Sequence, residues 1–288
     1  DFTKISINPA EIFSGGPPKD GIPAVTGPTL KPIAEETEID DREPVMSVAI
    51  EGHPARAYPV RYLMWHEIVN DRIGDVPVAV TFCPLCNSGL VFDLRLDGRE
   101  LELGVSGMLR HSDMIMYDRQ TESWWQQFTG EAIIGELQGK TLTPLPALLE
   151  SWAAFKARNP DGLVMAQPTG HNRPYGNNPY KSYDSGTPFL YRGENPPHDI
   201  HPLTRVIRVG DRAWPLTRLR EAGQLEEAGL LLKWTEGQAS ALDTRKIAKG
   251  REVGDVVVTK PDGSPVVFEV VFAFAFHAFT PDGEWMLE

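Results

Sequence analysis

Two stretches of this chain share one pattern, RAYPVRYL at residues 56–63 and RAWPLTRL at residues 212–219. Both read Arg-Ala-aromatic-Pro-aliphatic-x-x-Leu, and each follows a Val/Ile-rich segment and a glycine turn. Self-similarity of this kind is the signature of a repeated supersecondary unit. It predicts an internal duplication, with a first repeat over residues 44–164 and a second, cysteine-free repeat over residues 204–288 packed on the first.

Mainly β structure is predicted around and between these octets. Runs of alternating or β-branched residues indicate strands at 76–82, 89–96 and 100–106. Asp97-Gly98 between the last two runs is a strong hairpin signal. The apolar run 266–279 also resembles a hairpin, and helices are predicted only at 59–70 and 146–158. The expected fold class is mainly β (α+β), with antiparallel sheets or a barrel, internal duplication and a few short helices.

Two segments lie outside the predicted repeats. Residues 1–43 are rich in Pro, Gly and charge, and they predict an extended N-terminal arm on the surface. Residues 165–203 form a long Gly/Pro/Tyr-rich loop, and a loop of this length is usually a binding loop or a linker. Its tyrosines indicate that it packs against the rest of the chain.

The net charge of the chain limits the kinds of partner that it is expected to bind. The 288 residues include 40 acidic and 28 basic side chains, for a formal net charge of -12. Because affinity for nucleic acid and for anionic lipid depends on basic contacts, neither is an expected partner. No apolar run is long enough to predict a transmembrane segment. A small ligand or a protein partner both stay open.

The only two cysteines lie in one motif, Cys83-Pro84-Leu85-Cys86, which we call the Cys knuckle. Two thiolates at this spacing can form half of a zinc or copper site. They can also act as a thiol-disulfide oxidoreductase, although a thioredoxin-like site would place the second cysteine in a helix and a strand is predicted here. The third reading is structural, with a buried disulfide or two packed thiols that close a turn. The protein would then be a noncatalytic extracytoplasmic interaction module.

A half site needs further ligands, and two histidines are the candidates. His66 lies on a predicted helix that only a short connection joins to the cysteine strand, so we expect an imidazole nitrogen within about 6 Å of a sulfur. Neighbouring helical residues point about 100° apart, so only one of His66 and Glu67 can reach the knuckle. His111 is the second candidate. The predicted site is a copper or zinc ion held by Cys83, Cys86, His66 and His111.

Alternation after His111 predicts a strand with His111, Asp113 and Ile115 on one face and Met114 and Met116 on the other. The two methionines are predicted to belong to the core. The sequence contains no P-loop, no G-x-G-x-x-G after a strand and no H-E-x-x-H, so no nucleotide cofactor is expected. Enzyme and carrier are both open.

Several motifs resemble one prokaryotic family. They are WHEIVND at 65–71, TFCPLC at 81–86, MYDRQTESW at 116–124 and TGEAIIG at 129–135. In this order they resemble the family called domain of unknown function 3179. The resemblance implies a usually exported protein, periplasmic or extracellular, often made with a signal or lipoprotein leader, and it implies no established reaction. This chain has His111 where the family often has a small polar residue, so a role for His111 would belong to a subgroup.

Overall fold

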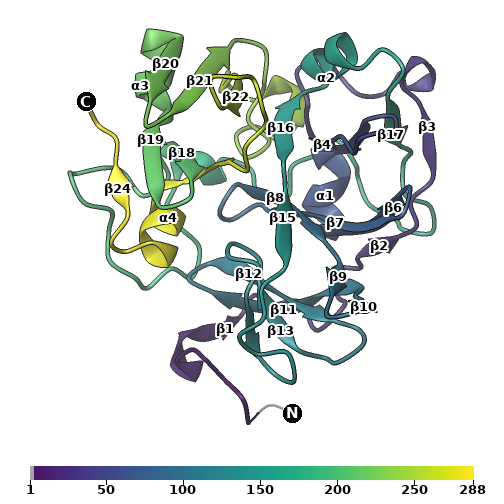
Figure 1. The fold of residues 1–288 in the computed structure, drawn as a ribbon, viewed down its shortest axis with the longest axis vertical. Coiled ribbons are helices and arrows are strands. Elements are labelled where there is room, and N and C mark those ends of the chain that lie inside the picture. Colours follow the sequence, from purple (N-terminus) through teal and green to yellow (C-terminus); the bar gives the residue numbers. More distant parts are fainter. Residues whose placement is uncertain (1–2) are drawn as a thin grey trace.

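Strands dominate the structure, a computed structural model that describes residues 3–288 (Figure 1). Five small sheets are arranged in a propeller-like ring, and four short helices lie between strands. The predicted mainly β fold with antiparallel sheets, short helices and an internal duplication is therefore confirmed.

Three of the sheets have five strands each. The first sheet is β1 (Ile12–Ser14), β11 (Leu103–Arg110), β12 (Asp113–Asp118), β13 (Trp124–Gln126) and β14 (Ala132–Ile134). The second is β15 (Thr143–Leu145), β8 (Ser88–Asp93), β7 (Val76–Cys83), β6 (Ile68–Ile73) and β2 (Val25–Thr26). The third is β16 (Ala147–Ser151), β4 (Pro44–Val48), β5 (Arg56–Pro59), β17 (Leu163–Met165) and β3 (Leu30–Pro32).

The other sheets are smaller. The fourth is β23 (Glu269–Phe272), β18 (Arg205–Val209), β19 (Arg212–Pro215) and β24 (Glu284–Trp285). The fifth is β20 (Gln224–Glu227), β21 (Leu230–Thr235) and β22 (Asp255–Thr259), and β9 (Arg95–Leu96) pairs with β10 (Arg99–Glu100) as a hairpin across Asp97-Gly98. The helices are α1 (Val60–His66), α2 (Trp152–Arg158), α3 (Leu216–Ala222) and α4 (Ala273–Phe279). Short 3-10 turns lie at Pro9–Glu11, Ile33–Glu35, Tyr183–Ser185 and Ile247–Lys249.

The duplication is visible in the pairing of the third and fourth sheets. In the third, β5 pairs antiparallel with β4 and parallel with β17, and β16 pairs with β4. In the fourth, β19 pairs antiparallel with β18 and parallel with β24, and β23 pairs with β18. Each copy continues through a helix, α1 or α3, into an antiparallel pair, β6–β7 or β20–β21. The sheet that contains β11 and β12 belongs to the first copy only.

Three sequence predictions of secondary structure were wrong in extent or type. The helix predicted over 59–70 ends at His66, because Glu67 adopts a φ of 59°. The helix predicted over 146–158 begins only at Trp152, since Ser151 caps it through its Oγ and the preceding residues pair with β4. The apolar run 266–279 is not a hairpin: it contains β23 and then α4.

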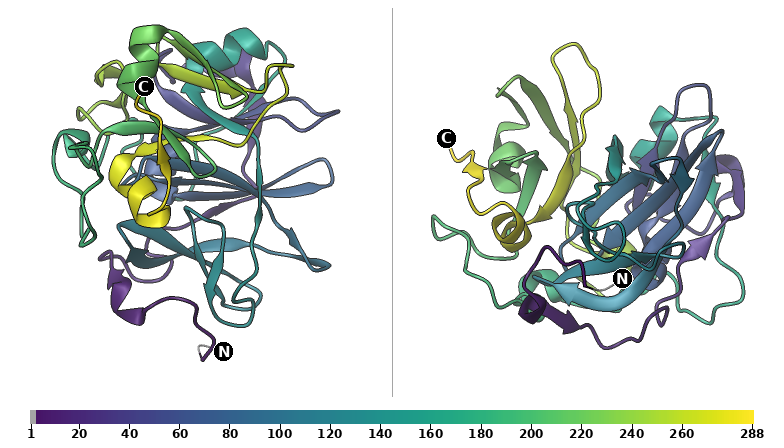
Figure 2. Two further views of the ribbon diagram at one scale, coloured as in Figure 1. Left: turned by 60° about the vertical axis from the view of Figure 1, so that its left-hand side comes forward. Right: turned by 60° about the horizontal axis from the view of Figure 1, so that its bottom comes forward.

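The arm and the long loop both contact the sheets. The arm supplies the edge strands β1, β2 and β3 to three different sheets. Figure 2 shows it along the side of the first half, with the C-terminal half next to that half. In the loop, four tyrosines pack against the main hydrophobic core, namely Tyr175, Tyr180, Tyr183 and Tyr191.

Candidate metal centre

The Cys knuckle closes the turn between β7 and β8. Cys83 is the last residue of β7 and pairs with Ser88, and the Asn87 N–H donates to the Pro84 carbonyl at 3.2 Å. Asn87 adopts a φ of 51°, which lets the chain reverse in a tight turn. Both cysteines are free thiols, and both are buried, with at most 1% of either residue exposed. The turn thus holds the two sulfur atoms in the core.

Asp113 is the third member of the cluster. One of its carboxylate oxygens and the sulfur atoms of Cys83 and Cys86 all lie within 4.8 Å of one another. Its Oδ2 accepts hydrogen bonds from Gln126 Nε2 at 2.7 Å and from the Phe128 N–H at 3.0 Å. Its Oδ1 is buried and has no N–H or O–H donor in residues 3–288, whereas the two thiols lie close enough to donate to the carboxylate. A metal ion at this point would take the place of the thiol protons.

An unusual turn brings Asp113 to the thiols. His111 and Ser112 form the two-residue connection between β11 and β12, with φ values of 50° and 63°. Such turns normally contain Asn-Gly, because two consecutive residues need positive φ. The Ser112 carbonyl accepts from Cys86 Sγ at 3.5 Å, and the Ser112 hydroxyl donates to the Phe189 carbonyl. Backbone strain of this kind is concentrated at functional sites.

Acidic groups surround the thiols. Burial raises the pKa of both cysteine thiols, and it raises the pKa of Asp113 to about 6 even though the Gln126 and Phe128 donors lower it. Burial, together with the charge of Asp113, raises the pKa of Glu67 to about 8. Burial and the negative charge of the neighbouring groups thus both favour the protonated forms. A metal ion that binds here would displace these protons.

Neither predicted histidine ligand is in this cluster. His66 is buried and uses both ring nitrogens: Nδ1 donates to the Pro23 carbonyl at 2.7 Å, and Nε2 bonds the Tyr175 hydroxyl at 2.6 Å. Since a carbonyl can only accept, the neutral ring accepts from Tyr175 at Nε2. His111 Nε2 lies 3.4 Å from Glu11, and its ring packs edge-on against Phe279. Ligation by either histidine would require these contacts to break.

Burial raises the pKa of the Cys83 thiol, and of the two adjacent residues His66 and Glu67 it is Glu67 that adds to this shift. The sequence singled out this pair but could not decide between them, because Glu67 lies just beyond α1 with left-handed φ. Asp113 could have been suspected from its place in the alternating strand. Its approach to the knuckle depends on the turn at His111 and Ser112, which no residue preference predicts.

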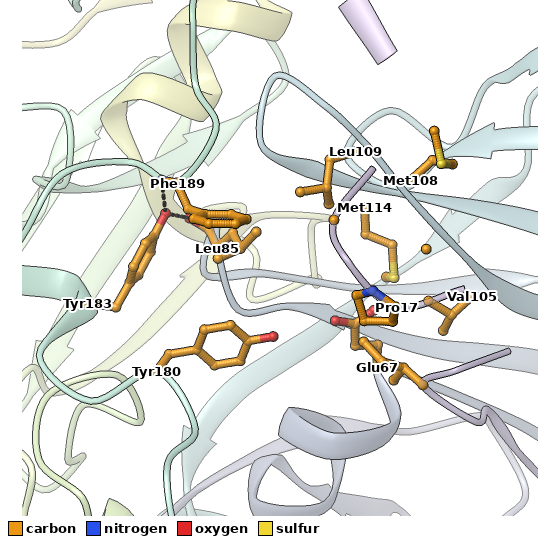
Figure 3. Close-up of a pocket in the computed structure, with 13 residues that line it drawn as sticks. Pro17, Glu67, Leu85, Val105, Met108, Leu109, Met114, Tyr180, Tyr183 and Phe189 are labelled. Atoms are coloured by element: carbon orange, nitrogen blue, oxygen red, sulfur yellow. Dashed lines mark hydrogen bonds between the residues drawn. The ribbon is translucent and has the colours of Figure 1, made fainter. Parts of the chain in front are cut away.

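A cavity of about 240 Å³ has Leu85 of the Cys knuckle in its wall (Figure 3). Two more lining residues come from elements close to the cluster in sequence. Met114 follows Asp113 in β12, and Glu67 follows α1. Its other lining residues come from the arm, from β11 and the bulge within it, and from the long loop: Gly15, Pro17, Ile22, Val105, Gly107, Met108, Leu109, Tyr180, Tyr183 and Phe189. The wall is mostly apolar.

The protein is thus a β-rich protein with a propeller-like ring of small sheets, and it contains a buried cluster of two cysteines and one aspartate. Residues 19–283 match the family described as "Protein of unknown function (DUF3179)", and the chain belongs to that family. No curated protein and no solved structure matches the chain. Within the described residues, no helix is both long enough and apolar enough to cross a membrane.

Proposed function

We propose that this chain is a metal-binding protein whose ion is held by Cys83, Cys86 and Asp113. The observation that carries the proposal is the burial of two thiols and a carboxylate within 4.8 Å of one another, with no N–H or O–H donor on Asp113 Oδ1 within the described residues. An unpaired polar atom in a protein core is costly unless a ligand completes it. Three protein ligands would leave a fourth tetrahedral position open, as in catalytic zinc sites.

Zinc suits this donor set better than copper. Zinc accepts thiolate sulfur and carboxylate oxygen together, at about 2.3 and 2.0–2.2 Å. Cu(I) prefers thiolate and thioether ligands, and a carboxylate is a hard donor. An exported location, periplasmic or extracellular, is a further part of the proposal, and it rests on the resemblance described in the sequence analysis.

A thiol-disulfide oxidoreductase is the less favoured function. Reactive cysteines have a lowered pKa and lie near basic groups or helix N-termini, where they are partly exposed. Here both thiols are buried, their pKa values are raised, and their charged neighbours are Asp113 and Glu67. These surroundings disfavour a nucleophilic thiolate and favour a cation.

Metal analysis of untagged protein purified without chelator tests the proposal. We expect about one zinc ion per chain, and Cys83→Ser, Cys86→Ser and Asp113→Asn should each reduce it to a small fraction. Asp118→Asn is the matched control, because Asp118 is equally buried at the other end of β12 and bonds Trp125 and Thr121 instead. Unchanged metal content in the three cluster variants would contradict the proposal.

Two further variants test the histidines. His66→Gln and His111→Gln should keep their metal, since neither ring lies in the cluster. Loss of metal in either variant would show that the substituted histidine is a metal ligand.

A further inference from the structure

Glu67 occupies a backbone position that its counterpart in the second repeat fills with glycine. Both residues end a seven-residue helix and donate their N–H to the carbonyl four residues earlier, Glu67 to Leu63 and Gly223 to Leu219. Their conformations agree, with φ and ψ of 59° and -32° for Glu67 and 71° and -36° for Gly223. Glycine adopts this region without steric cost, whereas glutamate does not. The first repeat therefore has the side chain of Glu67 at this position, although the backbone conformation is strained for any residue but glycine.

That side chain has no partner within the described chain. Glu67 is 7% exposed, and no hydrogen bond or ion pair to its carboxyl group exists among residues 3–288. Its remaining exposure faces the cavity, which it lines. A strained, buried and unpartnered carboxylate at a cavity wall is costly in the absence of a ligand, because both the conformation and the desolvation oppose folding.

The rest of the cavity matches a small ligand with one polar end. Its wall consists mainly of aliphatic, thioether and aromatic groups, including Val105, Leu109 and Met114. Figure 3 shows the Tyr180 ring extending into the cavity, with its hydroxyl toward the side on which Glu67 lies. An apolar cavity of about 150 Å³ is already large enough to bind benzene, so a cavity of about 240 Å³ can hold a ring and a short polar substituent.

The charge around the cavity selects a cationic end. Glu67 is the one carboxyl group among the described residues that line the cavity, and no Lys, Arg or His is among them. The site favours a cation with or without that metal. An ammonium group would pair with the Glu67 carboxylate, whereas an anionic ligand would be repelled by it.

From these observations we infer that the cavity binds a small amine: an apolar body against Val105, Leu109 and Met114, and an ammonium group that donates to the Glu67 carboxylate and the Tyr180 hydroxyl. This site is separate from the proposed metal ligands and does not depend on the ion. It accounts for the retention of glutamate where Gly223 serves the same turn in the second repeat.

Benzylamine is the probe, with toluene as the apolar body alone and benzoate as the anionic counterpart. Binding to the full chain is measured by calorimetry or by ligand-observed NMR. We expect benzylamine to bind at least tenfold more tightly than toluene and benzoate not to bind. Glu67→Gln should weaken benzylamine at least tenfold and Tyr180→Phe severalfold, and neither should affect toluene.

Glu43→Gln is the matched control, since Glu43 is a buried carboxylate paired with Arg61 outside the cavity. It should bind benzylamine as the wild type does. Equal affinities for benzylamine and toluene, an unchanged affinity in Glu67→Gln, or no binding of any probe would each overturn the inference. Metal content is measured on the same samples: a metal-free protein that binds benzylamine would refute the proposed metal centre alone, and the opposite result would refute the amine site alone.

Discussion

At the scale of single residues, the structure shows two acidic groups whose burial opposes folding. Glu67 has strained backbone and no partner, while Glu43 is buried beside Arg61 with 3.0 Å between Arg61 Nε and a carboxylate oxygen. Natural proteins keep such groups where function or specificity compensates for the lost stability. Each of these two carboxyl groups should affect the free energy of unfolding in a way that can be measured.

Glu67→Gly should raise the free energy of unfolding by about 1–2 kcal/mol, because glycine relieves the left-handed strain and removes an unpartnered carboxyl. Chemical denaturation at pH 8 measures the change. The mirror variant, Gly223→Ala, should lose about 1 kcal/mol through backbone strain alone, since a Cβ there would meet no atom within 4 Å. A loss of stability in Glu67→Gly as large as that in Gly223→Ala would show that the conformation at residue 67 is not strained.

Glu43 makes stability depend on pH. Burial raises its pKa from 4.5 to about 7, although Arg61 opposes the shift. The folded state therefore binds more protons than the unfolded state between these values, and the free energy of unfolding should fall as pH rises from 4.5 through 7. Glu43→Gln should reduce this fall by about 1–3 kcal/mol between pH 5 and 8. Identical pH profiles of the variant and the wild type would contradict the assignment.

At the scale of elements, one carboxylate joins the two repeats through a helix cap. Ser151 ends β16 and caps α2, and its N–H and Oγ both donate to Asp255 of β22 at 2.6 Å. Gln238 donates to the same carboxylate at 2.9 Å. Asp255 thereby satisfies three donors from the two repeats, and the position of α2 depends on it.

Asp255→Ala should cost about 2–4 kcal/mol, because it leaves several buried donors unpaired. Ser151→Ala should cost about 1 kcal/mol, the usual cost of losing a cap. Urea denaturation of both variants and of the double variant forms a complete cycle. We expect the double variant to lose less than the sum, whereas strict additivity would mean that the two side chains do not act as one unit.

At the scale of the whole molecule, the Cys knuckle of the first repeat is bonded to the second repeat. The Phe272 N–H of β23 donates to the Cys86 carbonyl at 2.9 Å, and Asn87 Nδ2 donates to the Val270 carbonyl at 2.6 Å. Ser88 donates to the buried carboxylate of Glu269 at 2.5 Å. The second repeat lacks cysteine, yet it positions the turn that holds both thiols.

Removal of the proposed metal should therefore destabilise both repeats together. Scanning calorimetry with and without a chelator should show one cooperative transition that moves to lower temperature without metal, because an ion that binds only the folded state stabilises the whole cooperative unit. Two transitions, only one of which responds to chelation, would show instead that the repeats unfold independently.

Local patterns in the sequence determined the class of fold. The matched octets at residues 56–63 and 212–219 indicated the duplication, and alternation with Asp97-Gly98 indicated strands and a hairpin, because these signals act within a few neighbouring residues. The spacing of Cys83 and Cys86 is also a local signal, and it indicated a candidate site at the knuckle.

Only the tertiary structure decided what surrounds that knuckle. Asp113 meets the thiols through the strained turn at His111 and Ser112, and Glu67 lies in the cavity wall where its φ of 59° ends α1. Both conformations oppose the intrinsic preferences of their residues, so no local pattern predicts them. They persist because pairing and packing across distant parts of the chain outweigh the strain.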